Sequence, residues 1–298
     1  LKGFEVLWQP GTDHAGIATQ LVVERNLEQK GLTREKIGRS KFEKEVWKWK
    51  SSSGNIISSQ LKRMGASLDW NREKFTMDKD FSDAVTEIFC SLYEEGLIYR
   101  GYRLVNWDVS LQTAISDLEI LSEEENSKIW HIAYKSKKTN KSIVVATTRP
   151  ETMFGDVAIA VNPNDKKYKN LIGESFEVPF CERSIEVIGD KYVDKSFGTG
   201  CLKITPAHDF NDFEIGKKHN LPVINILNKN GLLNENVPKK YQNLSILNAR
   251  KILLEDLQNN GALIKELNHK HNVPRSERTG EILAVSYTHL RAHETRSD

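Results

Sequence analysis

The residues best suited to chemistry are concentrated between positions 198 and 212, in the segment GTGCLKITPAHDFND. Within it, Leu202 and Ile204 alternate with Lys203 and Thr205. Because side chains alternate between the two faces of a strand, this pattern predicts a strand that buries the first pair and directs the second pair into a cleft. The cleft would then hold a cation and a hydroxyl group.

Two carboxylates follow this predicted strand. Asp209 and Asp212 are three residues apart, so we expect them to share one face of the next helical turn. A second polar cluster, residues 147–152, follows the apolar strand predicted at 143–146, and we expect it to face the first cluster. A cation beside two acids forms a polar pocket suited to a zwitterionic substrate.

Each of these residues also has a purely structural interpretation. Gly198 and Gly200 are typical of a turn, because glycine accepts positive φ angles. Asp209 is a typical helix N-cap, and for this residue capping and substrate binding are equally well supported. A single histidine beside acids, His208, is a poor zinc site, since zinc takes about four ligands. We therefore predict no metal site.

Composition sets the broad class. The 298 residues suffice for about two domains, and 38% hydrophobic and 28% charged residues are typical of a soluble protein. No apolar run approaches the roughly 20 residues needed to cross a membrane, and no signal peptide opens the chain, so we expect no membrane association. The chain begins in strand-like sequence without a methionine, which leads us to expect a fragment.

Charge and cysteine content narrow the class further. The 43 basic and 41 acidic residues nearly cancel, so any RNA contact must depend on local patches. The lysine-rich stretch 41–50 also contains glutamates, and we interpret it as a solvated helix face. Three widely spaced cysteines predict no disulfide framework and fit a reducing, cytoplasmic compartment. We expect Cys90 to be a core residue on the apolar face of its helix.

Periodicity predicts the elements that position these residues. Residues 5–8 are expected to form a buried strand that leads to a helix through Ala18 and Val23, and residues 81–96 a helix that buries one apolar stripe. The polar stretch 121–128 predicts a domain junction. Beyond it we expect a β-rich module with a helix near its end. Its predicted strands are 130–134, 143–146, 157–161, 185–188, 202–205 and 223–226, and its helix is 248–259.

Several stretches together resemble the bacterial-type valyl-tRNA synthetases, a family of class I aminoacyl-tRNA synthetases. The isoleucyl and leucyl families carry different residues after the aspartate that all three share. The resemblance runs from the first residue to about position 283. The stretches are GTDHAGIATQ at 11–20, GASLDW at 65–70, FTMD at 75–78, VNWD at 105–108 and TAISDLE at 113–119.

This resemblance implies an α/β fold in which a Rossmann-type aminoacylation domain is interrupted by an inserted β-rich, β-barrel-like editing domain. It places part of the aminoacylation domain at 1–125, with its start truncated, and the editing domain at 126–268. Residues 269–283 would return toward the catalytic domain. Residues 284–298 do not follow the family pattern, and we expect them to be a non-native tail.

The resemblance also implies roles for individual residues. Asp13 matches the acid that binds the amino group of valine, and Pro10 is a further expected valine contact. The family's ATP-binding motifs fall outside this chain, so its ATP-binding residues are unknown, and ATP with Mg²⁺ is expected as co-substrate of the parent enzyme. The residues that match the family's editing pocket are Arg149, Thr152, Lys203, Thr205, Asp209 and Asp212.

The expected function is that of a valine–tRNA ligase fragment. Threonine is nearly isosteric with valine, and a hydrophobic pocket rejects it only about a hundredfold, as is known for the valyl enzyme itself, so a second site must hydrolyse threonyl-tRNA. Expected partners are valine, its tRNA and threonine as the misactivated competitor, and we expect a monomer. Two alternatives are a free-standing aminoacyl-tRNA deacylase, disfavoured by the synthetase-like residues 1–125, and a non-catalytic tRNA-binding remnant, disfavoured by Lys203 and Asp212.

Overall fold

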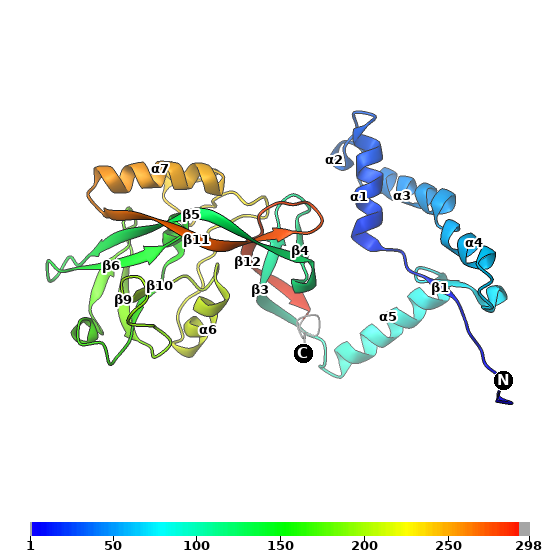
Figure 1. Cartoon of the computed structure of the whole chain (residues 1–298), viewed down its shortest axis with the longest axis horizontal. Coiled ribbons are helices and arrows are strands. Elements are labelled where there is room, and N and C mark those ends of the chain that lie inside the picture. Colours follow the sequence, from blue (N-terminus) through cyan, green and yellow to red (C-terminus); the bar gives the residue numbers. More distant parts are fainter. Residues whose placement is uncertain (1, 292–298) are drawn as a thin grey trace. The chain divides into compact units, whose positions relative to one another are not determined.

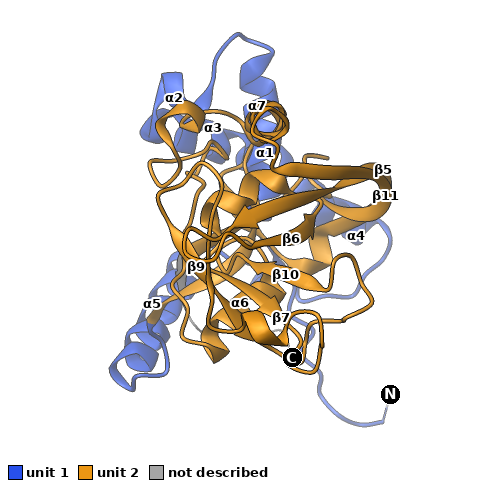
Figure 2. Cartoon of the chain, turned by 90° about the vertical axis from the view of Figure 1, so that its left-hand side faces the viewer, with its two compact units in different colours: residues 1–99 blue, residues 100–298 orange. Residues whose placement is uncertain are grey.

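The computed structural model describes residues 2–291 and is a mixed α/β protein. The chain forms two compact units that meet in sequence between Tyr99 and Arg100 (Figure 2). In the part of the chain that is described, no helix is both long and apolar enough to cross a membrane.

The first unit is mainly helical. A small core joins Val23 and Leu27 of α1 to Phe42 of α3, so the lysine-rich stretch predicted to be a solvated helix face also has one buried side. Two short strands pair in parallel, with Gly11 opposite Lys74. The elements, seen in blue and cyan in Figure 1, are β1 (Gly11–Thr12), α1 (Gly16–Glu28), α2 (Arg34–Ile37), α3 (Arg39–Ser53), α4 (Ile56–Arg63), η1 (Trp70–Arg72), β2 (Lys74–Phe75) and α5 (Lys79–Glu94).

Two sequence predictions for this unit are wrong. Residues 5–8 do not form a buried strand: they are irregular, and the side chains of Val6 and Trp8 are 83% and 60% exposed. A strand needs a hydrogen-bonded neighbour, and among residues 2–291 a single backbone bond, from Asp69 N to Trp8 O, reaches this segment. The helix predicted at 81–96 does form, as α5, but it buries none of its residues, and Cys90 is exposed rather than part of a core.

The second unit is built around one large sheet. Its strand order is β10-β7-β9-β8-β5-β11, with β6 also paired to β5. All its strand pairs are antiparallel except β7 with β9. The strands are β5 (Ile120–Lys135), β6 (Ser142–Thr147), β7 (Ala158–Val161), β8 (Ser175–Glu177), β9 (Ser184–Gly189), β10 (Cys201–Ile204) and β11 (Leu263–Ser276).

The helices of this unit cover the sheet at two places. Helix α7 (Ile246–Asn259) packs against β11 and buries Leu253 and Leu257, whereas α6 (Phe210–Lys218) packs against β10 (Figure 1). The predicted strands were found except residues 223–226, which are irregular although Ile226 is buried. The remaining short helices are η2 (Asp117–Glu119), η3 (Pro150–Gly155), η4 (Lys169–Leu171) and η5 (Lys239–Tyr241).

The stretch predicted as a domain junction lies within a long two-stranded ribbon. Strands β5 and β11 pair continuously from Ile120 opposite Ser276 toward the large sheet, and lie side by side in Figure 1. Asn126 lies opposite Lys270, and Asn268 lies opposite Lys128. The two predicted boundaries of the insertion, positions 126 and 268, are therefore close neighbours on paired strands, although the domain limits themselves stay a prediction.

A smaller sheet of order β12-β3-β4 completes the second unit, as β3 (Arg100–Asp108) pairs with β4 (Thr113–Ile115) and with β12 (Ala284–Arg291). The first residues of the predicted non-native tail therefore form a strand, with Ala284 and Val285 buried. Residues 292–298 of that tail lie outside the described part of the chain.

Candidate functional site

The strand that carries Lys203 begins after a glycine turn, as predicted. Gly198 and Gly200 have φ angles of 58° and 78°, a region that favours glycine. In β10, Lys203 is 7% exposed and the following Thr205 is 1% exposed, so both are buried rather than open to a cleft. The predicted alternation of Lys203 and Thr205 with Ile204 is confirmed. Ile204, on the opposite face, is also buried, because both faces of this strand are covered.

The buried lysine is held by a carboxylate that the sequence analysis did not select. Lys203 Nζ lies 3.0 Å from Asp156 Oδ1 and donates to Thr205 Oγ1 at 2.5 Å, while the Thr205 hydroxyl donates to the same Asp156 oxygen at 2.6 Å. The other oxygen, Oδ2, accepts a 2.7 Å hydrogen bond from the Tyr134 hydroxyl. Asp156 is fully buried, so the pair of opposite charges has little water around it.

Close packing brings this carboxylate to Lys203. Gly155 lies directly before Asp156, and a Cβ at that position would lie 3.0 Å from both Ile224 O and Thr205 Cγ2. A side chain at this position would require η3 or these neighbours to shift by a few tenths of an ångström. The Arg183 guanidinium fixes the backbone beside it by donating to Phe154 O at 2.6 Å and to Asp156 O at 3.1 Å.

The two predicted acids lie at the start of α6, Asp209 just before it and Asp212 in its first turn, and they differ in environment. Asp209 is the N-cap: its Oδ1 accepts from the backbone N–H groups of Asn211 and Asp212 at 2.9 and 3.1 Å, which confirms the capping interpretation. Asp212 is buried, and its Oδ2 accepts from Thr205 N at 2.8 Å. Burial raises the pKa of Asp212 to about 7, against the opposing effect of the nearby Lys203 charge.

The second polar cluster does face the first. Arg149 donates from Nη1 to His208 O at 3.1 Å, joining the two segments, and Thr152 donates from Oγ1 to Arg149 O at 2.8 Å. The buried Glu151 forms a two-point ion pair with Arg250 of α7, at 2.8 Å for each bond. These contacts fix the position of the Arg149 segment beneath α7.

His208 is structural in this arrangement. Its Nε2 accepts from Ile226 N at 3.0 Å, so the proton lies on Nδ1 and is donated to Val285 O at 3.0 Å. Burial, followed by the Arg149 charge, lowers the pKa of His208 to about 3. Among residues 2–291, no group of three or more His, Cys, Asp and Glu side chains has the arrangement of a metal site.

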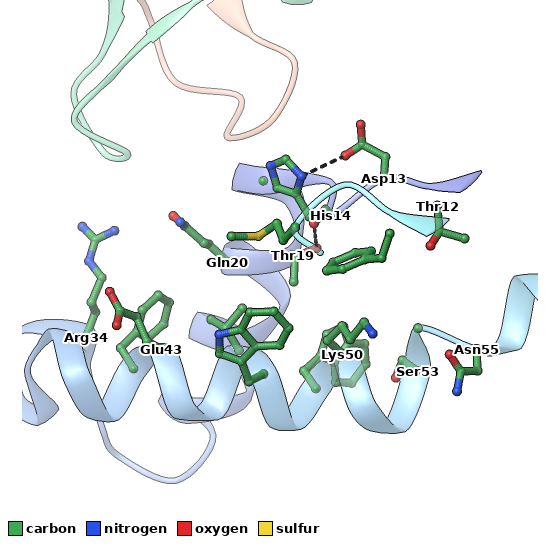
Figure 3. Close-up of a pocket in the computed structure, with 18 of the residues that line it drawn as sticks. Thr12, Asp13, His14, Thr19, Gln20, Arg34, Glu43, Lys50, Ser53 and Asn55 are labelled. Atoms are coloured by element: carbon green, nitrogen blue, oxygen red, sulfur yellow. Dashed lines mark hydrogen bonds and ion pairs between the residues drawn. The ribbon is translucent and has the colours of Figure 1, made fainter. Parts of the chain in front are cut away.

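A cavity in each unit lies near further predicted residues. In the first unit a cavity of about 1290 Å³ is lined by Asp13 and His14 together with residues of α1 and α3 (Figure 3). Asp13 Oδ1 accepts from Ala15 N at 2.6 Å, just before α1, and its side chain is 75% exposed. Pro10 is not among the lining residues, and its backbone O accepts a 3.2 Å hydrogen bond from Lys74 N.

In the second unit, a cavity of about 640 Å³ is lined by Gly198 and Thr199, not by Lys203.

Sequence patterns did not identify Asp156, Tyr134 or Glu151 as individual residues of the site. Asp156 is hydrogen-bonded to residues that are 22, 47 and 49 positions away in sequence. Separations of this size correspond to no helix or strand periodicity, so the sequence alone does not indicate these contacts. Glu151 lies inside the polar cluster that was selected, and its burial is the signal that only the structure supplies.

The profile of the family described as tRNA synthetases class I (I, L, M and V) matches residues 1–265. Because this match covers most of the chain, the protein belongs to that family of class I synthetases. Within the family, the valine–tRNA ligase of Legionella pneumophila strain Lens is 56% identical over 283 residues, and that of Francisella tularensis strain SCHU S4 is 54% identical over 283 residues. The valine–tRNA ligase of Dechloromonas aromatica is 53% identical over 288 residues.

These alignments cover 95% of this chain for the first two relatives and 97% for the third. They cover only 31%, 31% and 30% of the relatives themselves. The chain thus spans about a third of the length of the curated relatives that it matches.

Proposed function

We propose that this chain is part of a valine–tRNA ligase, which uses ATP with Mg²⁺ to attach valine to its tRNA. We further propose that residues 126–268 are an inserted editing domain that hydrolyses mischarged threonyl-tRNA, and that residues 1–125 belong to a Rossmann-type aminoacylation domain. The observation that carries the proposal is identity of 50–56% to relatives that bear this enzyme's name. A monomeric, cytoplasmic enzyme is part of the same proposal.

The buried polar site supports the editing role. A substrate α-ammonium placed at Asp212 adds a second positive charge to that of the nearby Lys203, so binding favours the charged form of this acid. Lys203 and Arg149 favour negative charge at the ester oxygen or at the terminal phosphate of the tRNA. A polar group beside the substrate side chain can bind the threonine hydroxyl, which valine does not possess.

No protein nucleophile is needed for this reaction. The aminoacyl ester is already activated, so a water oriented in the site attacks the carbonyl carbon and the bond to the tRNA ribose oxygen breaks. The ribose oxygen takes up a proton from the water and leaves as a hydroxyl, and threonine leaves as the acid that carries the water oxygen. The protein contributes orientation and charge, and both can reside in buried, hydrogen-bonded side chains such as Lys203 and Thr205.

The test is hydrolysis of preformed threonyl-tRNA and valyl-tRNA by the purified 298-residue chain. We expect threonyl-tRNA to be hydrolysed faster, and Lys203→Ala and Asp212→Ala to slow that reaction by about a hundredfold through loss of orientation. Lys240→Ala is the matched control, because this lysine of the same unit pairs with Asp256 through an exposed side chain. Wild-type rates in a folded Asp212→Ala protein would overturn the site assignment.

Two further measurements, tRNA binding by this chain and valine charging by the complete protein, separate the alternatives. Binding of tRNA without hydrolysis would favour a non-catalytic tRNA-binding remnant. Hydrolysis together with absence of valine charging by the complete protein that contains this chain would favour a free-standing deacylase. We expect the complete protein to charge its tRNA with valine.

A further inference from the structure

The two oxygens of the buried Asp156 carboxylate accept hydrogen bonds from different parts of the second unit. Oδ1 faces the candidate site and accepts from Lys203 and Thr205, at 3.0 and 2.6 Å. Oδ2 faces the core of the sheet and accepts from the Tyr134 hydroxyl at 2.7 Å. The contact to Tyr134 therefore fixes the rotation of the carboxylate plane, on which both contacts of Oδ1 depend.

Tyr134 is itself held rigidly. It is 0% exposed and lies in β5 opposite Ile143 of β6, inside the main core cluster of the second unit. Burial, followed by the Asp156 charge, raises the pKa of Tyr134 well above its usual value, so the phenol keeps the proton that it donates. A buried phenol that donates to a buried carboxylate has no freedom to turn toward another partner.

We infer that Tyr134 is a positioning residue of the editing site, acting through Asp156 to hold Lys203 Nζ and Thr205 Oγ1 in place. The inference rests on the editing function proposed above, and it adds a residue from the interior of the sheet to a site otherwise built from β10, η3 and α6. Tyr134 touches neither substrate nor reacting atoms, and its contribution is the orientation of the carboxylate.

The chain contains a well-matched control for this hydroxyl. Tyr241 is 2% exposed, belongs to the same core cluster, and donates from its hydroxyl to Asp256 Oδ2 at 2.6 Å. Asp256, however, lies in α7, pairs with Lys240 at the surface and is not hydrogen-bonded to Lys203. Tyr134→Phe and Tyr241→Phe thus remove the same group from the same core, and only the first is joined to the site.

The first readout is the chemical reactivity of Lys203, which does not depend on catalysis. Trace acetylation with acetic anhydride, followed by mass spectrometry, measures the rate at Lys203 relative to the exposed Lys218 in the same sample. We expect Tyr134→Phe to speed acetylation of Lys203 about tenfold, the change that follows when one hydrogen bond to a charged group is lost. Tyr241→Phe should leave it unchanged. Equal protection of Lys203 in wild type and Tyr134→Phe would overturn the inference.

The second readout is hydrolysis of threonyl-tRNA. We expect Tyr134→Phe to lower kcat between about tenfold and a hundredfold with little change in KM, because misplacement of a catalytic group by about 1 Å has this effect. Tyr241→Phe should retain wild-type kcat, even though both variants are expected to lower Tm. An equal fall of kcat in the two variants would show a general loss of core stability and contradict a positioning role. If the wild-type chain hydrolyses no threonyl-tRNA, the proposed function fails, and the acetylation rate at Lys203 alone decides the inference.

Discussion

Thr205 and Asp156, 49 residues apart in sequence, are joined by a 2.6 Å hydrogen bond between the threonine hydroxyl and the carboxylate Oδ1. The same oxygen accepts from Lys203, so strand β10 and the end of η3 share one buried ion pair. An ion pair of this kind is costly to break from one side, because the remaining charge stays buried without a partner.

Asp156→Ala should therefore destabilise the second unit strongly. We expect a loss of about 3–5 kcal/mol in the free energy of unfolding, since the buried ammonium of Lys203 is left unpaired. Urea unfolding followed by circular dichroism measures this value. The double variant Asp156→Ala/Lys203→Met should recover part of the loss. A loss below about 1 kcal/mol would instead match an exposed pair, such as Lys79 with Asp83.

The raised pKa of Asp212 predicts a specific pH dependence of stability. Folding favours the protonated carboxyl, so its stabilising contribution is full below the unfolded pKa near 3.8 and is lost as pH rises through about 7. Asp212→Asn cannot lose a proton there. The difference in unfolding free energy, wild type minus Asp212→Asn, should fall by up to about 4 kcal/mol between pH 4 and pH 8. A difference that does not change with pH would contradict the raised pKa.

Hydrolysis of threonyl-tRNA should show the opposite trend with pH. If the ionised Asp212 binds the substrate ammonium, kcat/KM rises with pH through an apparent pKa near 7. The rate measured from pH 5.5 to 8.5, corrected for spontaneous ester hydrolysis, tests this. Asp212→Asn should have a low rate without that rise, and retention of the rise in this variant would assign it to another group.

The capping role of Asp209 can be separated from a role in the site. Asp209→Asn keeps an oxygen that accepts from the first turn of α6, whereas Asp209→Ala should cost about 1 kcal/mol of stability. Thermal unfolding of the two variants measures this difference. If Asp209 only caps the helix, Asp209→Asn hydrolyses threonyl-tRNA at the wild-type rate. A folded, stable Asp209→Asn protein with a low rate would show that the charge itself is needed.

For Asp13 in the first unit, a structural role can likewise be separated from a role in substrate binding. Its side chain is exposed and accepts from Ala15 N, a contact that Asp13→Asn preserves. In the complete protein, we expect Asp13→Asn to lower valine-dependent pyrophosphate exchange at least about tenfold, because the substrate ammonium loses its charged partner. Hydrolysis of threonyl-tRNA should be unchanged. Wild-type exchange by Asp13→Asn would leave this residue with its contacts to Ala15 N and to the His14 ring, 3.6 Å away, and no role in valine binding.

Local sequence patterns predicted helices α1, α3, α5 and α7 and five of the seven strands of the large sheet, because periodicity and end signals are encoded in neighbouring residues. Gly198, Gly200 and the N-cap Asp209 are examples, and the structure has all three as predicted. The patterns failed where burial depends on distant partners. No residue of the apolar stripe of α5 is buried, and residues 5–8 lack a neighbouring strand.

Of the residues in the candidate site, some could be predicted from the sequence and others could not. Lys203, Thr205 and Asp212 lie close enough in sequence for their types and spacing to be noticed, and the structure brings them together. Asp156 has no such signal, because a lone acid after a glycine is common in loops. Its importance depends on a fold that joins Tyr134, Lys203 and Thr205 around it.

The ribbon of β5 and β11 constrains the order in which the chain folds. It pairs residues as far apart in sequence as Ile120 and Ser276, a separation of 156 positions, so closing it first would mean confining a very long loop. Once the intervening strands and α7 have packed, the ends of β5 and β11 that belong to the large sheet already lie near each other. The remaining residue pairs of the ribbon can then form one after another. Contacts between residues so far apart in sequence form slowly if no other structure has formed before them. The ribbon is therefore expected to close late in refolding, after amides of the central sheet have become protected from hydrogen exchange.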